Sequence, residues 1–276
     1  MTDEMLWIAG PCSVESYEIF VESAKKLHPT FKGTNWYLKG SFDKANRTAV
    51  TGRRGPGLEQ TIEIFNEIKR MYPDIRIITD VHETHQVEPL ADVVDAIQIP
   101  AFLCRQTDLL VESGRCFNYV NIKKGQWMSP QQTSHFHEKV KSQNPKAEVW
   151  ITDRGTSFGY GNLIVDFGAA AILKKFCDKV IFDCTHSTQR IVGDFTRGDR
   201  EMAKQYLLAS VPFGFDGIFM ETHPDPDTAL SDSTCQVDMD DVYMLKEKYS
   251  QMKQAYLAKV KLASRKKKRK TTGGRK

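Results

Sequence analysis

The sequence predicts an α/β fold of the (β/α)8 TIM-barrel class, and three observations support this prediction. Eight short runs that favour β-structure recur at spacings of roughly 20 to 40 residues. Segments with helical spacing lie between them, and the chain of 276 residues suits a barrel of about 250 residues. A doubly wound open sheet is the alternative, but no GxGxxG follows the first strand to support a dinucleotide site.

The predicted strands are short and apolar. Several, such as Val180-Ile181-Phe182, are near-continuous apolar segments, which is typical of parallel strands buried on both faces. In chain order the predicted strands are Leu6–Gly10, Asn35–Lys39, Arg76–Asp80, Ala96–Ile99, Tyr119–Lys123, Val149–Asp153, Lys179–Asp183 and Gly217–Glu221.

The segments between these strands carry helical periodicity. In the second of them, Leu58, Ile62, Phe65 and Ile68 fall on one face of a helix. The predicted helices are Glu15–Leu27, Gly57–Met71, Pro130–Lys141, Asn162–Phe176, Arg200–Ala209 and Asp238–Val260.

The net charge of +4 belongs to the C-terminus. Residues 263–276 hold eight Lys or Arg and no acid, so removing those eight charges from +4 leaves −4 for residues 1–262. We therefore expect one catalytic domain over residues 1–262 and a basic, disordered tail over residues 263–276. Such a tail is solvated, binds nucleic acid, or acts as a nuclear-localisation-like signal through residues 266–270.

The composition favours a cytoplasmic protein. No apolar run approaches the roughly 18 residues of a membrane span, so we expect no membrane partner. The N-terminus is acidic and lacks the pattern of a secretory signal. Six cysteines occur without CxxC pairs, which indicates reduced thiols rather than a disulfide framework.

Polar and ionisable residues follow each predicted strand. Because the carboxyl ends of all barrel strands form one face, these residues should meet at one mouth and form an active site. They fall into two groups by residue type. The cationic group is Lys39, Lys44, Arg47, Lys123 and Arg154, assisted by Ser41, Asn46, Thr48 and Gln98.

The cationic group predicts multiply charged anionic substrates. Five cations facing one cavity would repel each other unless anions such as phosphates or carboxylates occupied it. The second group is Cys12, His186, Glu221 and Asp232, whose ligand types suit a divalent Mn, Fe, Co or Zn ion.

Long motifs in this chain resemble the 3-deoxy-D-manno-octulosonate-8-phosphate synthase family, over about residues 6 to 250. The matching segments are Ile8-Ala9-Gly10-Pro11-Cys12, Lys39–Thr48, Thr79–Glu83, Gln98–Leu110, Asn121–Gln126, Arg154–Tyr160 and Phe219–Asp225. The resemblance implies a TIM barrel that condenses phosphoenolpyruvate with D-arabinose 5-phosphate and water and releases phosphate. It also implies a cytoplasmic homotetramer that serves lipopolysaccharide sugar synthesis.

The resemblance also implies roles for single residues. Cys12 marks the metal-dependent class, so Cys12, His186, Glu221 and Asp232 would hold the metal. Phosphoenolpyruvate would be held by Lys39, Ser41, Lys44, Gln98, Ala101, Lys123 and Arg154. The pentose phosphate, in turn, would be held by Asn46, Arg47 and Thr48, with Asp80 and His82 near its hydroxyls or the attacking water. Arg105 would reach the sugar phosphate in a neighbouring subunit.

Two departures and two rival functions remain. The loop after His186 is shorter and poorer in glycine than is usual in the family, which affects expected turnover rather than the site, and the tail from Ala263 is outside the family pattern. The related 3-deoxy-D-arabino-heptulosonate-7-phosphate synthases use erythrose 4-phosphate, but they favour Lys-Pro-Arg-Thr where this chain has Lys44–Thr48. The other rival is a non-catalytic barrel whose tail binds polyanions.

Overall fold

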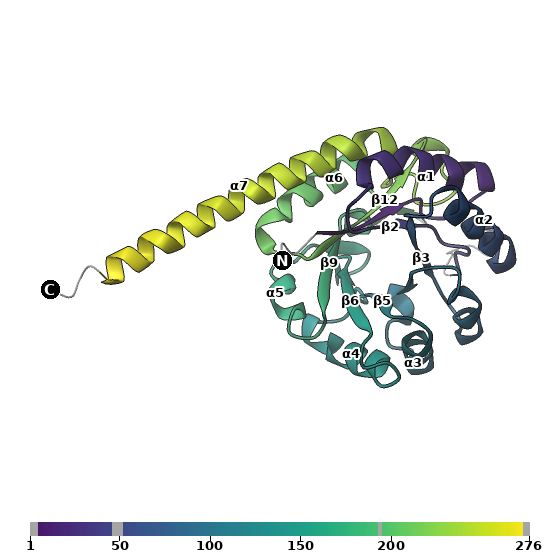
Figure 1. Cartoon of the computed structure of the whole chain (residues 1–276), viewed down its shortest axis with the longest axis horizontal. Helices are drawn as coiled ribbons and strands as arrows, with labels where there is room; N and C mark the ends of the chain where they lie inside the picture. The colour runs from purple at the N-terminus through teal and green to yellow at the C-terminus, as the bar shows by residue number, and fades with distance from the viewer. Residues whose placement is uncertain (1–4, 46–51, 193–194, 273–276) are drawn as a thin grey trace.

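Eight parallel strands close into a barrel in the computed structural model, which describes residues 5–45, 52–192 and 195–272. These strands are β1 (Leu6–Gly10), β2 (Trp36–Lys39), β3 (Arg76–Asp80), β4 (Ala96–Ile99), β5 (Tyr119–Lys123), β6 (Glu148–Asp153), β9 (Lys179–Asp183) and β12 (Gly217–His223). Each pairs with the next, and β12 pairs with β1, with Ile8 opposite Phe219 (Figure 1). The TIM-barrel prediction is confirmed, and every predicted strand agrees with the structure within two residues at its ends.

The barrel interior is filled by alternate side chains of these strands. One buried cluster contains Leu6, Ile8, Tyr37, Ile78, Ala96, Trp150, Ile181 and Phe219. The intervening residues, such as Trp7 and Ala9, pack instead in the larger cluster that includes helix residues. This period of two is the ordinary alternation of a strand, so residues two positions apart share a face.

The same alternation determines which polar side chains lie at the mouth. Lys39 comes two residues after Tyr37, Asp80 after Ile78, Gln98 after Ala96, Asp183 after Ile181, and Glu221 after Phe219. Each of these polar residues therefore lies on the interior face, one step closer to the carboxyl end of its strand. Strand alternation thus places side chains from Lys39 to Glu221, far apart in the sequence, at the same end of the barrel.

Helices surround the strands, as Figure 1 shows. They are α1 (Tyr17–Phe31), α2 (Leu58–Met71), α3 (Thr107–Cys116), α4 (Ser134–Lys141), α5 (Ala169–Leu173), α6 (Arg200–Ala209) and α7 (Met239–Thr272). Helix α1 begins after Ser16, whose hydroxyl accepts a hydrogen bond from the Ile19 N–H at 3.3 Å, and it buries Phe20, Ala24 and Leu27. The 3-10 helices are η1 (Thr84–Gln86), η2 (Glu88–Leu90), η3 (Ala101–Leu103), η4 (Pro130–Thr133), η5 (His186–Thr188), η6 (Val211–Phe213) and η7 (Pro226–Thr228).

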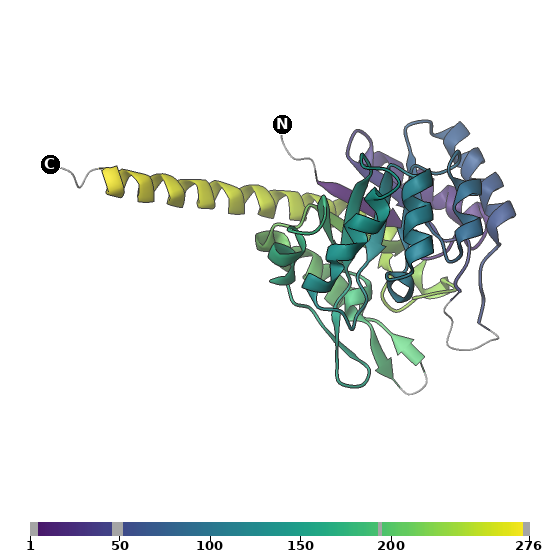
Figure 2. The same ribbon diagram turned by 90° about the horizontal axis from the view of Figure 1, so that it is seen from below.

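Two hairpins follow the strands β6 and β9, and the first replaces part of a predicted helix. The helix predicted for Asn162–Phe176 is wrong over its first half, because β7 (Thr156–Phe158) and β8 (Asn162–Ile164) form an antiparallel hairpin. Gly159 and Gly161 between them have φ values of 63° and 93°, a turn conformation that favours glycine. After His186, β10 (Arg190–Val192) and β11 (Phe195–Arg197) add a second hairpin, and β10 pairs with β8. Figure 2 shows both hairpins extending beyond one end of the barrel.

Helix α7 begins after the short strand β13 (Val237–Asp238) and leaves the barrel. Val242, Leu245 and Tyr249 are buried near its start, whereas its C-terminal half extends away from the barrel (Figures 1 and 2). The predicted helix ended at Val260, but α7 continues to Thr272, because Lys and Arg are good helix formers. The division into residues 1–262 and 263–276 stays a prediction. No helix within the described residues is both long and apolar enough to cross a membrane.

Candidate active site

Asp80, at the end of β3, is the centre of the first group of mouth residues. Ser41 Oγ donates a hydrogen bond to its Oδ2, and Gln98 Nε2 donates one to its Oδ1. The ammonium groups of Lys39 and Lys44 lie 4.0 Å and 3.9 Å from Oδ2. Burial alone would raise the pKa of Asp80, but the two lysines and the Ser41 hydroxyl hold it well below its usual range.

Lys39 connects this group to the ends of the neighbouring strands β1 and β12. Its side chain is 2% exposed, and Nζ donates to the Cys12 carbonyl at 2.6 Å, to Ser41 Oγ at 2.9 Å and to Glu221 Oε1 at 3.0 Å. Gly10 allows this approach of β1 and β2, since a Cβ at Gly10 would lie 2.2 Å from the Lys39 carbonyl oxygen. Lys39 is therefore a buried cation that already holds a carboxylate.

Asp183, at the end of β9, joins Lys123 to His186. Lys123 Nζ donates to its Oδ2, which also lies 2.7 Å from His186 Nδ1, while the backbone N–H groups of Thr185 and His186 donate to Oδ1. Burial would raise the pKa of Asp183, but His186 and Lys123 bring it far below its usual range.

The Lys123 ammonium also lies 3.1 Å from the centre of the Phe219 ring. Burial outweighs the attraction of Asp183 and lowers the pKa of Lys123 to about 8.

Cys12, Glu221 and Asp232 form a group that could hold a metal ion. One ligand atom from each lies within 4.8 Å of the other two. Cys12 Sγ lies 3.1 Å from Asp232 Oδ2, and His186 Nε2 lies 3.3 Å from Glu221 Oε2. The structure therefore groups three of the four predicted metal ligands, and the fourth, His186, contacts one of these three, Glu221.

The donor set fits a divalent cation on two grounds. Burial, followed by the Glu221 carboxylate, strongly raises the pKa of the Cys12 thiol, and the nearby Lys44 and Lys39 offset this only in part, so a bound cation would supply the further positive charge that a thiolate needs. Glu221 Oε2 is buried and forms no hydrogen bond within the described part of the chain, and the group that it faces is the His186 imidazole, itself a predicted ligand. Sulfur, imidazole and carboxylate together suit a borderline divalent ion.

Arg154 reaches the metal-ligand group through one amide side chain. Its guanidinium donates to Gln189 Oε1, and Gln189 Nε2 donates to Asp232 Oδ1 at 2.8 Å. Burial lowers the pKa of Arg154 below its usual value, and the nearby Asp183 and Asp232 carboxylates offset this only in part. Gln189 thus fixes a predicted substrate-binding cation relative to a predicted metal ligand.

The cations of the mouth are paired with carboxylates, which corrects the prediction that they are unbalanced. Asp80, Asp183 and Glu221 lie between Lys39, Lys44 and Lys123. This pairing is expected, because buried charges in proteins are paired. Anionic substrates would therefore bind by displacing carboxylates from these cations rather than by filling an unbalanced pocket.

Two other predicted residues lie next to the mouth strands. His82 follows β3 and packs edge-on against Phe42, with ring centres 5.7 Å apart. Its Nδ1 is buried without a hydrogen-bond partner among the described residues, and burial lowers the pKa of His82. Ala101 begins η3 just after β4 and is half-buried.

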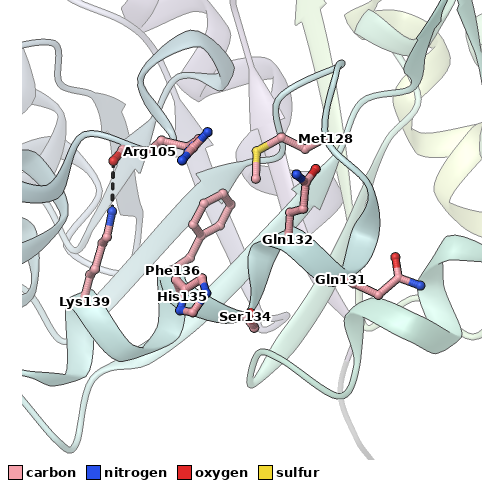
Figure 3. A pocket seen from close by; sticks show the side chains of 8 residues that line it. All are labelled: Arg105, Met128, Gln131, Gln132, Ser134, His135, Phe136 and Lys139. Carbon is pink, nitrogen blue, oxygen red and sulfur yellow. Dashed lines mark hydrogen bonds between the residues drawn. The ribbon is translucent and has the colours of Figure 1, made fainter.

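Arg105 does not join this cluster. It lines a separate cavity of about 520 Å³ whose other walls come from the Met128–Lys139 region, as Figure 3 shows. Its backbone carbonyl accepts a hydrogen bond from Lys139 Nζ at 2.9 Å (Figure 3). Asn46, Arg47 and Thr48 lie outside the described residues.

Four residues that contact the predicted site residues were not themselves predicted as site residues: Asp183, Asn121, Gln189 and Gln236. Strand alternation could have found the first two, because Asp183 follows Ile181 by two residues and Asn121 precedes Lys123 by two. Asn121 Nδ2 donates to Gln98 Oε1 at 2.8 Å, which extends the hydrogen-bond chain from Asp80. Gln189 and Gln236 lie in loops, where no local sequence pattern predicts their contacts.

Comparison with known proteins agrees with this geometry. Residues 2–258 match the model of the DAHP synthetase I family. A 2-dehydro-3-deoxyphosphooctonate aldolase of Helicobacter hepaticus is 45% identical over 242 residues, covering 83% of this chain and 89% of that protein. The proteins of that name from Wolinella succinogenes (44% identity; 83% and 91% covered) and Campylobacter jejuni subsp. doylei (41%; 86% and 93%) are similar too. This chain therefore belongs to the DAHP synthetase I family and, within it, to the 2-dehydro-3-deoxyphosphooctonate aldolases.

Proposed function

We propose that this enzyme condenses phosphoenolpyruvate with D-arabinose 5-phosphate and water to give 3-deoxy-D-manno-octulosonate 8-phosphate and inorganic phosphate. A bond forms between C3 of phosphoenolpyruvate and the aldehyde carbon, and water oxygen adds at C2. The C2–O bond to phosphate breaks, and the aldehyde oxygen gains a proton. The observation that carries the proposal is that the mouth combines buried cations for two anionic groups with a separate set of metal-ligand types.

The cations would bind phosphoenolpyruvate. Lys39 and Lys44 come from one wall, while Lys123 and Arg154 come from the ends of β5 and β6. Their present partners are carboxylates and an amide, so a phosphate or a carboxylate of the substrate can replace them with stronger charge-assisted bonds. Positive charge develops at C2 as water adds, and Asp80 and Glu221 supply negative charge near that position.

Asp80 and His82 would act on the second substrate or on water. Asp80 stays ionised because its pKa is held low, so it can orient a hydroxyl or a water molecule as an acceptor. His82 keeps a buried, unbonded Nδ1 among the described residues and a lowered pKa, so its neutral imidazole can accept a proton. Asn46, Arg47 and Thr48 would hold the pentose phosphate.

The enzyme would belong to the metal-dependent class. Cys12, His186, Glu221 and Asp232 would hold a divalent ion, which would supply Lewis-acid orientation of the aldehyde or of water. Asp183 would hold the imidazole of His186 through Nδ1, so that Nε2 points toward Glu221 and the ligand group. A homotetramer in which Arg105 reaches a neighbouring active site, and a cytoplasmic location, belong to the same proposal.

Phosphate release from phosphoenolpyruvate tests the substrate assignment. We expect release to depend on the aldose and to be at least about tenfold faster with D-arabinose 5-phosphate than with erythrose 4-phosphate, a difference of about 1.4 kcal/mol in barrier height. Faster release with erythrose 4-phosphate would replace the pentose by the tetrose as substrate. No release with either aldose, across Mn²⁺, Fe²⁺, Co²⁺ and Zn²⁺, would favour the non-catalytic barrel.

A further inference from the structure

Two distant segments carry the metal-ligand group. Cys12 lies in the loop after β1, and Asp232 lies in the loop after β12, so more than 200 residues separate them in the chain. Neither loop is part of a strand or helix at the ligand itself. Something outside the ligands must therefore fix the distance between these two loops.

Gln236 joins the two loops directly. Its side chain is fully buried, and its Oε1 accepts a hydrogen bond from the Cys12 N–H at 3.1 Å. Its Nε2 donates to the Ser231 carbonyl at 2.7 Å, one residue before Asp232. The backbone of Gln236 is held as well, because its N–H donates to the Asp232 carbonyl at 3.0 Å and its carbonyl accepts from Arg200 Nε at 2.8 Å.

Glu15 makes a second connection between the same loops. Its Oε1 accepts a hydrogen bond from the Leu230 N–H at 3.0 Å, and its Oε2 lies 3.6 Å from His223 Nε2. The carboxylate is 7% exposed. It therefore ties the β1 loop to the residues that precede Asp232 on the other side of the ligand from Gln236.

Backbone strain is concentrated in this corner of the molecule. Within the described residues, Glu15 and Asp232 are the two non-glycine residues with positive φ, at 59° and 52°. Such conformations are unfavourable for residues with a side chain and persist where surrounding contacts hold them in place. Both lie in the loops that Gln236 and Glu15 connect, so these hydrogen bonds stabilise a conformation that the chain alone disfavours.

We propose that Gln236 and Glu15 are positioning residues that clamp the Cys12 and Asp232 loops together and so set the metal affinity. The proposal rests on the proposed metal-dependent function, and it assigns a role to two side chains that are not metal ligands themselves. Gln236 is the stronger part of the clamp, because both ends of its amide bridge the loops. Glu15 supports Leu230 and the strained turn that follows.

Binding of Co²⁺ to the metal-stripped full-length protein tests the clamp. The dissociation constant would be measured by competition with a chromophoric chelator, and thiolate ligation by the charge-transfer absorption of Co²⁺. Gln236→Met keeps the side-chain volume and loses both hydrogen bonds, so we expect its affinity to fall about 10–100-fold, as for other outer-shell partners of metal ligands. Gln205→Met, on the exposed side of α6, makes the same substitution outside the clamp and should keep wild-type affinity.

A second pair of variants separates the clamp from general stability. Glu15→Gln retains an acceptor for the Leu230 N–H and should change Co²⁺ affinity by less than about threefold, whereas Glu15→Leu should weaken it about tenfold. Phosphoenolpyruvate affinity of the metal-stripped protein should stay unchanged in these variants, which shows that the mouth is still folded. If Gln236→Met and Glu15→Leu bind Co²⁺ as tightly as the wild type, the clamp is wrong. If the wild type itself does not bind Co²⁺, Mn²⁺ or Zn²⁺, the proposed metal site is wrong, and the role proposed for Gln236 and Glu15 is wrong as well.

Discussion

The two halves of the barrel mouth use opposite charge arrangements. In the anion half, formed by Lys39, Lys44, Lys123 and Arg154, every cation already has a carboxylate or amide partner. In the half that we propose to bind a metal, called the metal half and formed by Cys12, His186, Glu221 and Asp232, a thiol and two carboxylates lie together, and one of the carboxylates contacts the imidazole. In the anion half, each cation can exchange its present partner for an anionic group of the substrate. In the metal half, the thiol and the two carboxylates outnumber the one imidazole that could carry positive charge.

The halves are joined by shared partners rather than by separate walls. Asp183 contacts Lys123 and His186, Glu221 contacts Lys39 and His186, and Gln189 contacts Arg154 and Asp232. A cation bound in the metal half would offset Glu221 and leave Lys39 freer to bind phosphate. The comparison therefore predicts that the two halves affect each other's ligands.

The largest effect should come from removing a ligand of the metal half. Cys12→Ala should lower kcat/KM at least about 100-fold, because even outer-shell partners of metal ligands are worth about 10–100-fold. Cys177→Ala is the matched control, since that half-buried thiol donates to the backbone carbonyls of Leu173 and Lys179, away from the mouth residues, and should stay within about twofold of the wild type. Steady-state phosphate release measures both, and equal activity of the two variants would remove Cys12 from the mechanism.

Removing a cation of the anion half should have the next largest effect. Lys123→Met leaves Asp183 buried without its ammonium partner, and loss of such a charge pair costs about 2–5 kcal/mol. We expect the KM for phosphoenolpyruvate to rise about 30-fold or more. Lys141→Met, which breaks an ion pair with Asp178 on the far side of the barrel wall, is the control. An unchanged KM in Lys123→Met would mean that this residue does not bind the substrate.

Asp183→Asn should disturb both halves at once and to a smaller extent. The amide keeps the shape but loses the charge that holds Lys123 and His186, so Co²⁺ affinity and phosphoenolpyruvate affinity should each fall about tenfold. Isothermal titration with each ligand separately measures the two losses. A loss confined to one ligand would show that the halves are independent, contrary to the comparison above.

The pH dependence should be the mildest test of the anion half. Because burial lowers the pKa of Lys123 to about 8, its positive charge is present below that pH and is lost above it. The value of kcat/KM for phosphoenolpyruvate should then fall about tenfold per pH unit above pH 8. The fall should disappear in Lys123→Arg, which stays charged. A profile that is flat between about pH 7 and about pH 9.5 in the wild type would contradict this assignment.

The sequence carried enough information for the barrel and for most of the mouth. Strand positions follow from local apolar runs, and the alternation that places Lys39, Asp80 and Glu221 at one end is equally local. The pairing of Lys39 with Glu221 depends on the closed barrel, because β2 and β12 are brought within two strands of each other only when β12 pairs with β1. Lys123 and Asp183 lie on β5 and β9, two strands apart along the sheet, so their pairing depends on the strand order rather than on closure. Gln189 and Gln236 act through loops whose partners are distant in sequence, so no periodic pattern reveals them.

Irregular segments limited the prediction of secondary structure. Helix α3 was not predicted, because Ser113 and Gly114 lie on its buried face and interrupt the apolar periodicity. The segment Asn162–Ile164 looked helical from its apolar residues, but the glycines before it turn the chain into a hairpin. Tertiary contacts determine both outcomes.

The most direct test of the joined mouth is phosphate release from phosphoenolpyruvate and D-arabinose 5-phosphate after treatment with a chelator. The chelator should abolish release, and Mn²⁺, Fe²⁺, Co²⁺ or Zn²⁺ should restore it to the starting rate, because the anion half depends on charge supplied to the metal half. Full activity in the chelator, with no metal bound to the protein, would contradict the account.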